Sequence, residues 1–515
     1  MKKTLKIILI IPLALLLLVL IVLSAKYSPA YVYRLLTMNV ADVYDYQNFE
    51  NRKIKGSGNT FEFEKNLDES YVESLFSDRV LQSKFNSIDE WAKKSKTTAL
   101  IFIRKDTILY EKYFNGFARE SYFHSQSMAK SFISFLIGAA LDDGLISGLD
   151  DSMTKYIPEL KDRDPRFEKI SIRNLLEMRS GLKYYEGYFP GTHIHLPWHD
   201  EAVGYYHPKV RKLLLEKVDI AQEPGKTFQY CNYNTSYLGL IIERATGKTV
   251  SEYLQEKLWT KMMKYSALFS IDSKESGFEY IPSRLIARAI DYARFGRLYL
   301  KGGNWNGEQI ISQNWVNKST KENASIPRNI YPVWLGGENC NHTYYSYQWW
   351  GHTECDSTFQ FFANGNLGQA IYVIPDKEII IVHCGNSNEL FSAYDLWHVA
   401  DCIKFNDFHK KVNQKGVTEA ISEYYEVRND SIHPFSERFL MDKGYAYLNG
   451  GKIDDAKKLF ELNLKTHPGS WNAYNNLAEA FSLADEVDSA IVYYKKSLQL
   501  KPQNNWATEK LKVLD

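Results

Sequence analysis

The first strong hydrophobic pattern of the chain is an uncharged run near its N-terminus. Ile7–Leu23 contains no charged residue and follows a segment, residues 1–6, that carries three lysines. With the two small residues that come next, a helix over 7–25 would be roughly 28 Å long, close to the roughly 30 Å hydrocarbon core of a bilayer. The pattern predicts a transmembrane anchor over 7–25 with residues 1–6 in the cytoplasm. A cleaved signal peptide is the alternative, in which Ala25 would suit one recognition position of the cleavage site, whereas Leu23 would not suit the other.

The stretch after this span has a different character. Tyr27–Asn66 is rich in tyrosine and polar residues and shows only weak periodicity. We therefore predict a stalk over residues 26–74 that can pack on the domain that follows it.

The middle of the chain, residues 75–405, combines strand and helix patterns. Ala99–Arg104 and Thr107–Tyr113 are strand-like runs separated by Lys105-Asp106, which predicts a β-hairpin. Phe132–Leu141 is apolar on all sides, so it predicts a helix that is buried at the centre of the domain.

Two further apolar runs lie near the end of this region. Ala370–Ile374 and Ile379–His383 are joined by the turn sequence Pro375-Asp376-Lys377, and we predict a hairpin at the edge of a sheet. The glycine-rich segment Phe361–Gln369 precedes the hairpin. Glycines at such a place let a ligand approach the backbone closely.

The C-terminal region, residues 410–515, repeats itself with a period of 34 residues, as the pair Pro468 and Pro502 illustrates. The small and aromatic positions that follow the same period are Gly444/Ala478, Tyr447/Phe481, Ala456/Ala490 and Phe460/Tyr494. The spacing resembles that of tetratricopeptide repeats, in which small residues let paired helices approach closely. So short an array favours a helical appendage docked on the main domain, and a groove that binds a protein partner is the second interpretation.

Composition narrows the classes of function. Of the 515 residues, 44% are hydrophobic and 24% are charged, which excludes wholesale disorder. The 63 Lys and Arg residues against 62 Asp and Glu give a net charge of +1, so nucleic acid is not expected as the main ligand. The five cysteines are too few for a disulfide scaffold, although Cys340 and Cys355 could pair outside the cytoplasm.

Candidate chemistry begins with the pattern Ser-x-x-Lys. It occurs three times, at Ser127/Lys130, Ser152/Lys155 and Ser180/Lys183. Only the first copy opens the buried helix, whereas Ser152 is predicted to cap a helix and Ser180 to lie in a loop. Residues three apart share one face of a helix, so the Lys130 amine can reach the Ser127 hydroxyl. Burial lowers the pKa of a lysine and makes it a usable base, and a helix N-terminus favours a developing oxyanion.

A second segment adds a phenol and an amide. Tyr230 stands two residues before Asn232. A tyrosine near a lysine cation can titrate below its ordinary pKa of about 10, so Tyr230 is a candidate general base. A core aromatic residue is the alternative for Tyr230, because the chain holds 36 tyrosines. Asn232 could hydrogen-bond a substrate carbonyl.

Taken in order, Ser127-x-x-Lys130, Tyr230-x-Asn232 and the glycine-rich segment resemble the serine β-lactamase and penicillin-recognising hydrolase family, closest to its class C-type members. The form Gly-x-x-Gly-Gln over Gly365–Gln369 is similar to that of the 6-aminohexanoate-dimer hydrolases. The resemblance implies an α+β fold of the β-lactamase/transpeptidase type, in which an antiparallel sheet is flanked by helices and joined to a helical subdomain.

The resemblance also implies an acyl-enzyme mechanism that uses neither a metal nor a cofactor. Ser127 would attack a carbonyl, and Lys130 and Tyr230 would pass its proton to the leaving group. The backbone N–H groups of Ser127 and Asn366 would form the oxyanion hole. Asn232, Gly365 and Asn366 would thus lie beside the substrate.

One departure from the family pattern bears on the substrate. Lys-Thr-Gly of β-lactamases and cell-wall peptidases, whose lysine helps hold a substrate carboxylate, is replaced by Ala363-Asn364-Gly365. An unpaired buried carboxylate is costly, so an ester or a less anionic amide is the expected substrate. The alternatives are a D-alanyl carboxypeptidase/transpeptidase or β-lactamase-type enzyme of peptidoglycan metabolism, and a non-catalytic scaffold that binds partners through the repeat.

A histidine-rich loop lies between these motifs. His193-Ile194-His195 and His199-Asp200 superficially match a zinc-hydrolase cluster, but their spacing is wrong for three converging ligands, and no metal site is expected. We predict that residues of this loop line the cleft. The candidates are Tyr184, Tyr185, Glu186 and Trp198.

The expected protein is therefore a single-pass protein of a bacterial inner membrane, with its hydrolase domain on the periplasmic side. Secretion after signal cleavage is the second possibility.

Overall fold

The computed structural model describes residues 2–39, 42–58, 60–76, 85–185, 187, 194–323, 342–353, 359–391 and 437–514, together with the single positions 396, 399, 403, 415, 418, 419, 421 and 422. Three predictions from the sequence fall on other residues: the Cys340–Cys355 pair, the cleft residue Glu186 and His193 of the histidine-rich loop.

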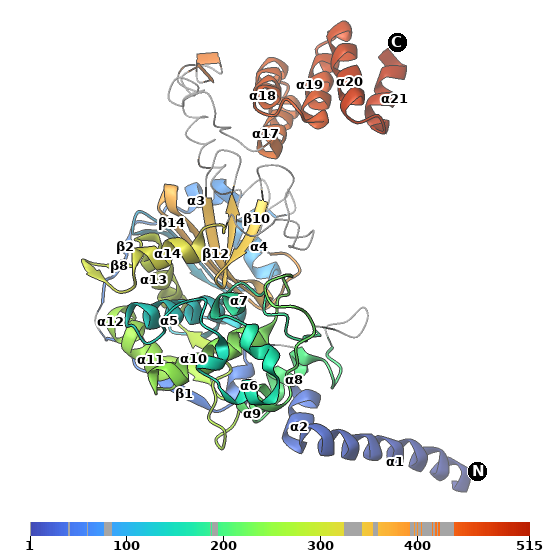
Figure 1. Ribbon diagram of the computed structural model, residues 1–515. Helices are drawn as coiled ribbons and strands as arrows, with labels where there is room; N and C mark the ends of the chain where they lie inside the picture. The colour runs from blue at the N-terminus through green and yellow to red at the C-terminus, as the bar shows by residue number, and fades with distance from the viewer. Residues whose placement is uncertain are drawn as a thin grey trace.

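Among the described residues, a sheet of eight strands forms the centre of the molecule, in the order β10-β11-β12-β13-β14-β3-β4-β2 (Figure 1). Neighbouring strands are antiparallel except for the short pair β2 and β4, which is parallel. The strands are β2 (Glu64–Lys65), β3 (Thr97–Arg104), β4 (Thr107–Tyr113), β10 (His342–Ser346), β11 (Trp349–Thr353), β12 (Phe359–Gly365), β13 (Gln369–Ile374) and β14 (Ile379–Gly385). The predicted hairpin over residues 99–113 is confirmed as β3 and β4.

The second predicted hairpin exists, but its predicted position at a sheet edge is wrong. β13 and β14 pair with each other and lie in the middle of the sheet, between β12 and β3. Every residue of both strands is buried. Continuous apolar runs such as these are typical of strands that are covered on both faces, and the turn residue Pro375 lies outside the ladder, where it removes no hydrogen bond.

The buried helix predicted over residues 132–141 is confirmed as α5 (Ala129–Asp142). It packs on α13 (Ala289–Leu300), where the rings of Phe132 and Phe295 stack at 3.8 Å. α13 in turn rests on the sheet at Gly296, where a Cβ atom would lie 3.0 Å from a methyl carbon of Ile371 and 2.9 Å from one of Ile380. The close approach that this glycine permits fixes the distance from α5 to the sheet.

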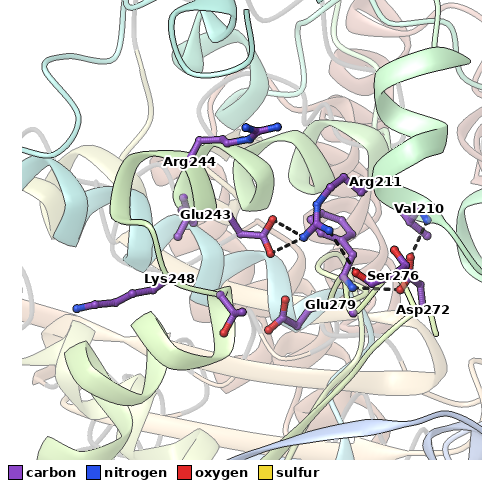
Figure 2. Close-up of polar contacts among 12 residues, drawn as sticks. Val210, Arg211, Glu243, Arg244, Lys248, Asp272, Ser276 and Glu279 are labelled. Carbon is purple, nitrogen blue, oxygen red and sulfur yellow. Dashed lines mark hydrogen bonds and ion pairs between the residues drawn. The ribbon is translucent and has the colours of Figure 1, made fainter. Parts of the chain in front are cut away.

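A group of helices forms the subdomain beside α5 (Figure 1). They are α6 (Glu159–Arg163), α7 (Ile172–Leu176), α8 (Asp200–Tyr206), α9 (Val210–Glu216), α10 (Asn232–Thr246), α11 (Val250–Leu254) and α12 (Thr260–Met262). Figure 2 shows how two of them are joined: Arg211 of α9 donates to both carboxylate oxygens of Glu243 of α10, at 3.0 and 2.9 Å. Asp272 accepts the backbone N–H of Val210 at 2.7 Å and fixes the start of α9.

The remaining helices of the central region lie at its periphery. They are α3 (Glu69–Phe76), α4 (Ile88–Lys94) and α14 (Gln313–Thr320), and a small hairpin is formed by β8 (Asn304–Trp305) and β9 (Glu308–Gln309).

The stretch predicted as a stalk contributes directly to the central region. β1 (Asn51–Ile54) pairs antiparallel with β6 (Ala267–Ser270), at the edge of a second sheet ordered β1-β6-β7-β5. The other strands of this sheet are β5 (Phe123–His124) and β7 (Leu285–Ala287). The segment therefore extends a sheet of the hydrolase-like region through main-chain hydrogen bonds.

A buried arginine joins this N-terminal segment to the helical subdomain. The guanidinium carbon of Arg284 lies 3.5 Å from the ring centre of Phe49 and 3.9 Å from that of Tyr205. Its Nη2 donates to the Tyr205 carbonyl at 2.6 Å, and the Tyr205 hydroxyl donates to Asp45 at 3.1 Å. Burial raises the pKa of Asp45 to about 6, even though Arg284 and two hydrogen bonds oppose the rise. The carboxyl group is thus held in a site that penalises its charge.

The predicted membrane span falls within α1 (Lys2–Tyr27), which is followed by α2 (Pro29–Met38). In the part of the chain that the structure describes, no single helix has the length and hydropathy of a membrane span. Leu13–Tyr27 and Pro29–Met38 satisfy the criteria only as a pair, across a bend of 116°, and a signal sequence can satisfy them as well.

The C-terminal region consists of antiparallel helices that stack on one another (Figure 1). They are α17 (Glu437–Asn449), α18 (Ile453–Thr466), α19 (Trp471–Leu483), α20 (Val487–Leu500) and α21 (Asn505–Leu514). Ala456, Ala478 and Ala490, all predicted as close-approach positions, are fully buried. The ring of Phe460 fills the space beside Gly444, where a Cβ atom would collide with it.

We predict that Asp45→Asn removes a pH-dependent part of the stability. The native carboxyl binds a proton near pH 6 and the unfolded one near 3.8, so the wild-type protein gains stability as the pH falls from 8 to 5. The gain from this residue is roughly 1.4 kcal/mol. Urea unfolding of wild type and Asp45→Asn at the two pH values measures it, with the exposed Glu64→Gln as control. A variant that keeps the full pH slope would contradict the assignment.

Candidate active site

Ser127 lies in a tight turn between a strand and the buried helix. Gln126 has φ 44°, an uncommon conformation for a residue with a side chain, and the 3₁₀ turn η2 (Gln126–Met128) leads into α5. Ser125 fixes the turn to β7 and the segment before it by two hydrogen bonds. Its N–H donates to the Leu285 carbonyl at 2.9 Å, and its hydroxyl donates to the Ser283 carbonyl at 3.1 Å. The turn therefore presents Ser127, which is partly exposed, at the start of a rigid helix.

His124 supports the same turn. Its Nδ1 accepts the backbone N–H of Gln126 at 3.1 Å. Burial and the nearby charge of Arg284 lower the pKa of His124 to about 3, so the imidazole is neutral near pH 7 and remains an acceptor.

Lys130 lies one turn further along the helix, with its side chain inside the protein. It is 1% exposed, and its Nζ donates to Ser127 Oγ at 2.8 Å and to the Pro282 carbonyl at 3.2 Å. The same nitrogen lies 5.0 Å from the centre of the Tyr230 ring. The structure therefore brings together Ser127, Lys130 and Tyr230, which are far apart in sequence.

Tyr230 is fixed by aromatic neighbours from the sheet. Its ring stacks on Trp350 at 5.6 Å with an interplanar angle of 24°, and it meets the edge of Tyr345 at 6.0 Å. Both partners lie on the hairpin of β10 and β11. The phenol is partly exposed and is positioned from two sides, by the start of α10 and by the sheet.

Asn232 begins α10, and its amide group is oriented by a carboxylate. Its Nδ2 donates to Glu201 Oε2 at 2.6 Å, and the Tyr184 hydroxyl donates to the same oxygen. A carboxylate only accepts, so the nitrogen end of the amide must face Glu201. The other end, Oδ1, is buried and accepts no hydrogen bond from the described residues.

The end of β12 closes against the Ser127 turn. A Cβ atom on Gly365 would lie 2.7 Å from the carbonyl oxygen of Ser125, so only glycine fits here without displacing the backbone. Asn366, which is exposed, follows in a 3₁₀ turn, and its side-chain oxygen accepts from Asn388. Segment 365–366 is thereby held beside the Ser127 turn.

Buried hydrogen bonds from β3 and β14 fix the residues that follow segment 365–366. His383 Nδ1 donates to the Gly368 carbonyl, and the Thr97 hydroxyl lies 2.8 Å from its Nε2. Burial lowers the pKa of His383 to about 4, so the neutral ring donates through one nitrogen and accepts through the other. Gln369 adds a bond from Nε2 to the Gly385 carbonyl at 2.6 Å.

Gln348 connects the helices beneath the site. It lies in the turn between β10 and β11, where Tyr347 and Gln348 both have positive φ, and it is 2% exposed. Its carbonyl accepts from Ser131 of α5 at 2.8 Å, and its Oε1 accepts from Thr235 of α10 at 2.8 Å. Its Nε2 donates to the carbonyls of Leu175 and Leu176, both at 3.1 Å. One side chain and its backbone thus join α5, α7 and α10.

The other Ser-x-x-Lys copies behave as the sequence predicts. Ser152 caps a short helical turn by accepting the N–H of Thr154 at 3.2 Å, and Lys155 donates to Ser147 and Asp151. Ser180 is buried in a loop, where it accepts the N–H of Leu182 at 3.4 Å. Within the described residues, Lys183 makes no hydrogen bond to Ser180.

The predicted cleft residues divide into two kinds. Tyr184 is buried against Tyr233 and donates a hydrogen bond to Glu201, so it belongs to the packed interior, and its place in a cleft stays a prediction. Tyr185 and Trp198 are 59% and 58% exposed. His199 lies beside both exposed rings and accepts the backbone N–H of Leu196 at 3.2 Å.

Three residues near the site were not predicted from the sequence: Glu201, Gln348 and His383. Glu201 directly follows the histidine-rich loop, and an acidic residue at the start of a helix carries no distinctive signal. Gln348 lies in a turn with no recognisable motif, and His383 ends an apolar strand, where its polarity was the available signal.

Comparison with known proteins agrees with this geometry. The family model described as Beta-lactamase matches residues 87–401, more than half of the chain. The chain therefore belongs to the Beta-lactamase family, and it is a serine hydrolase of that family.

Individual relatives are distant. A 6-aminohexanoate-dimer hydrolase of Paenarthrobacter ureafaciens is 29% identical over 245 residues, which span 46% of this chain and 60% of that protein. An uncharacterised protein of Alkalihalophilus pseudofirmus is 22% identical over 372 residues, 64% of this chain and 96% of its own. The solved structure of a candidate 6-aminohexanoate-dimer hydrolase from Bacillus anthracis superposes with a TM-score of 0.57 at 22% identity and covers 72% of this chain and 94% of that one. The last likeness shows a shared fold.

We predict that Glu201 acts by orienting Asn232. Glu201→Leu removes the acceptor of a charge-assisted hydrogen bond worth about 1.5–3 kcal/mol, so kcat should fall by roughly 10- to 100-fold with a smaller change in KM. Steady-state kinetics on an activated ester measure this split.

Tyr184→Phe is the matched control, because it removes the other donor to Glu201 and leaves the Asn232 bond in place. It should lower kcat by less than about tenfold. Equal losses in the two variants, or a change confined to KM, would contradict an orienting role.

Proposed function

We propose that the chain is a membrane-anchored serine hydrolase that cleaves an amide or ester bond through an acyl-enzyme on Ser127. The observation that carries the proposal is the contact between Lys130 Nζ and Ser127 Oγ, 2.8 Å long, under the ring of Tyr230. A hydroxyl in contact with an amine, with a phenol ring packed against that amine, supports nucleophilic acyl transfer.

The proposed reaction has two halves. Ser127 Oγ forms a bond to the substrate carbonyl carbon while Lys130 takes the hydroxyl proton. Lys130 gives that proton to Tyr230, and Tyr230 passes its own proton to the leaving nitrogen or oxygen as the bond from that atom to the carbonyl carbon breaks. Water then adds to the acyl-enzyme by the reverse proton path, and the carboxylic acid and free Ser127 result.

The backbone N–H groups of Ser127 and Asn366 are the proposed donors to the oxyanion. The support is the close approach at Gly365, which brings the end of β12 to the Ser125 carbonyl. Asn232 would meet the substrate beside them, with its amide orientation set by Glu201.

An ester or a weakly anionic amide is the proposed substrate class. Ala363 and Asn364 stand where the resemblance places a carboxylate-binding lysine and threonine, and neither carries a charge. The name of the Paenarthrobacter relative favours a linear amide. Peptidoglycan peptides and β-lactams, the alternatives, present a carboxylate next to the reacting amide and are the less favoured substrates.

For the N-terminus, we propose an uncleaved anchor over residues 7–25 in a bacterial inner membrane, with the hydrolase domain in the periplasm. The support is the length of the uncharged run and the lysines before it.

For the C-terminal region, we propose tetratricopeptide-like repeats over residues 410–515. The supporting observation is that α17, α19 and α21 begin at Glu437, Trp471 and Asn505, which are successive offsets of 34 residues. A protein partner on these helices is a further proposal, and a chain that only binds partners is the non-catalytic alternative.

We predict that Ser127→Ala and Lys130→Met each abolish labelling by a fluorophosphonate probe and lower turnover of a p-nitrophenyl ester by at least about 10³-fold. The equally spaced pair Ser152→Ala and Lys155→Met is the matched control and should retain labelling and turnover. Full labelling in Ser127→Ala would eliminate the mechanism, and a wild-type chain without any hydrolysis would favour the scaffold.

The same assay separates the substrate classes. The wild-type chain should hydrolyse the ester and a linear ω-amino-acid amide faster than a penicillin or a D-alanyl-D-alanine peptide. Release of D-alanine that is faster than hydrolysis of both the ester and the linear amide would favour the peptidoglycan alternative.

We predict that the full chain expressed in a bacterial host stays in the membrane fraction after alkaline carbonate washing, and that its intact mass includes residues 1–25. A soluble periplasmic product that begins near residue 26 would instead support the cleaved signal.

A further inference from the structure

A surface cavity of about 410 Å³ lies where three segments of the chain meet. Tyr44 comes from the N-terminal segment, Phe117 and Tyr122 from the loop between β4 and β5, and Arg288 from the junction of β7 and α13. None of the lining residues belongs to the Ser127 cluster. The cavity is therefore a separate candidate site, and it does not depend on the proposed function.

Arg288 provides the cationic group of this cavity. Its guanidinium carbon lies 4.1 Å from the ring centre of Tyr122, and its Nε is buried without a hydrogen-bond partner among the described residues. The neighbouring arginines on α13 are paired: Arg294 bonds Asp291 at 2.7 Å, and Arg297 bonds Asp106 at 2.9 Å. Arg288 has no such carboxylate within the described part of the chain, and a buried donor without an acceptor is destabilising.

Aromatic rings form the walls beside this cation. Tyr44 packs on Phe117 with ring centres 5.6 Å apart, and Tyr46 meets the edge of Tyr122 at 6.4 Å. A guanidinium presents two parallel N–H donors that match the two oxygens of a carboxylate. Rings on either side accept a planar or apolar body. The combination fits an amphipathic anion.

The charge of the lining residues limits the anion further. Glu120 also lines the cavity, at an exposed position, and it opposes the binding of a multiply charged group such as a phosphate. A ligand with a single negative charge therefore matches the one arginine, Arg288, and is repelled least by Glu120.

We infer that this cavity binds a small organic carboxylate, with the carboxylate on Arg288 and the apolar body between Tyr44, Phe117 and Tyr122. The ligand supplies the carboxylate partner that Arg288 lacks among the described residues.

The test uses the detergent-solubilised full chain and 4-fluorobenzoate, observed by ¹⁹F NMR titration. Wild type and Ser127→Ala should bind it saturably, since the active-site serine is not involved, and 4-fluorobenzyl alcohol should bind far more weakly. Arg288→Gln should weaken 4-fluorobenzoate binding by about tenfold or more, the loss of a charge-assisted bidentate contact. Arg244→Gln is the matched control, because Arg244 is an exposed arginine that pairs with Glu159 at 2.8 Å.

Two results would overturn the inference: no saturable binding by the wild-type chain, or equal affinity in wild type and Arg288→Gln. Unchanged ester turnover in Arg288→Gln verifies that the variant is folded. If Arg288→Gln does not fold, Phe117→Leu is the second variant, because it keeps the cation and removes one aromatic ring of the cavity. It should weaken 4-fluorobenzoate binding by several-fold, and unchanged binding would contradict the inference.

A competition arm identifies the source of the carboxylate. Displacement of 4-fluorobenzoate by a short peptide with a free C-terminus, but not by its C-terminal amide, assigns the site to a peptide end. Binding of 4-fluorobenzoate without displacement assigns it to a free small molecule. Both outcomes support a carboxylate site at Arg288.

Discussion

A primary amine inside a protein must find acceptors, and the burial of Lys130 imposes this requirement on the site. Its nitrogen meets the Ser127 hydroxyl and the Pro282 carbonyl and lies against the face of Tyr230. These groups come from the turn η2 before α5, from the segment that leads into β7, and from the residues just before α10. The placement of one side chain therefore couples three parts of the fold, and a shift of any one part would cost the amine one of its contacts.

The rigidity behind this arrangement comes from packing and from buried hydrogen bonds. α5 cannot rotate, because it is buried on all sides and stacks on α13, which in turn rests on the sheet at Gly296. Gln348 fixes α5, α7 and α10 relative to one another with bonds that water cannot replace at a buried position. The preorganisation that an acyl-transfer site needs is thus a property of the core, while the exposed rings of Tyr185 and Trp198 lie where variation costs little.

The sequence predicted the parts of this arrangement that are local. The hairpin of β3 and β4, the buried helix α5 and the cap at Ser152 each follow from residues within a few positions of one another. The contacts of Glu201 with Asn232 and of Gln348 with Ser131 could not be predicted from the sequence, because they form only when distant segments pack together. The central position of β13 and β14 was missed for a related reason, since a turn sequence identifies a hairpin and not what lies on either side of it. The stretch from 26 to 74 shows only weak periodicity because its amphipathic helices are short and far apart. α2 buries one face of ten residues, α3 buries one face of eight residues, and the segment between them adds single anchoring residues such as Asp45 and Phe49.

The pairing of β1 with β6 has a consequence for any shortened form of this protein. β1 covers one side of β6 along Ala267–Ser270, a strand that is largely buried. A chain trimmed beyond Ile54 would leave the main-chain N–H and C=O groups of that strand open, and open apolar edges recruit strands from other molecules. Soluble versions of the protein should therefore keep β1 and begin before Asn51, since a start beyond Ile54 invites aggregation of an otherwise intact domain.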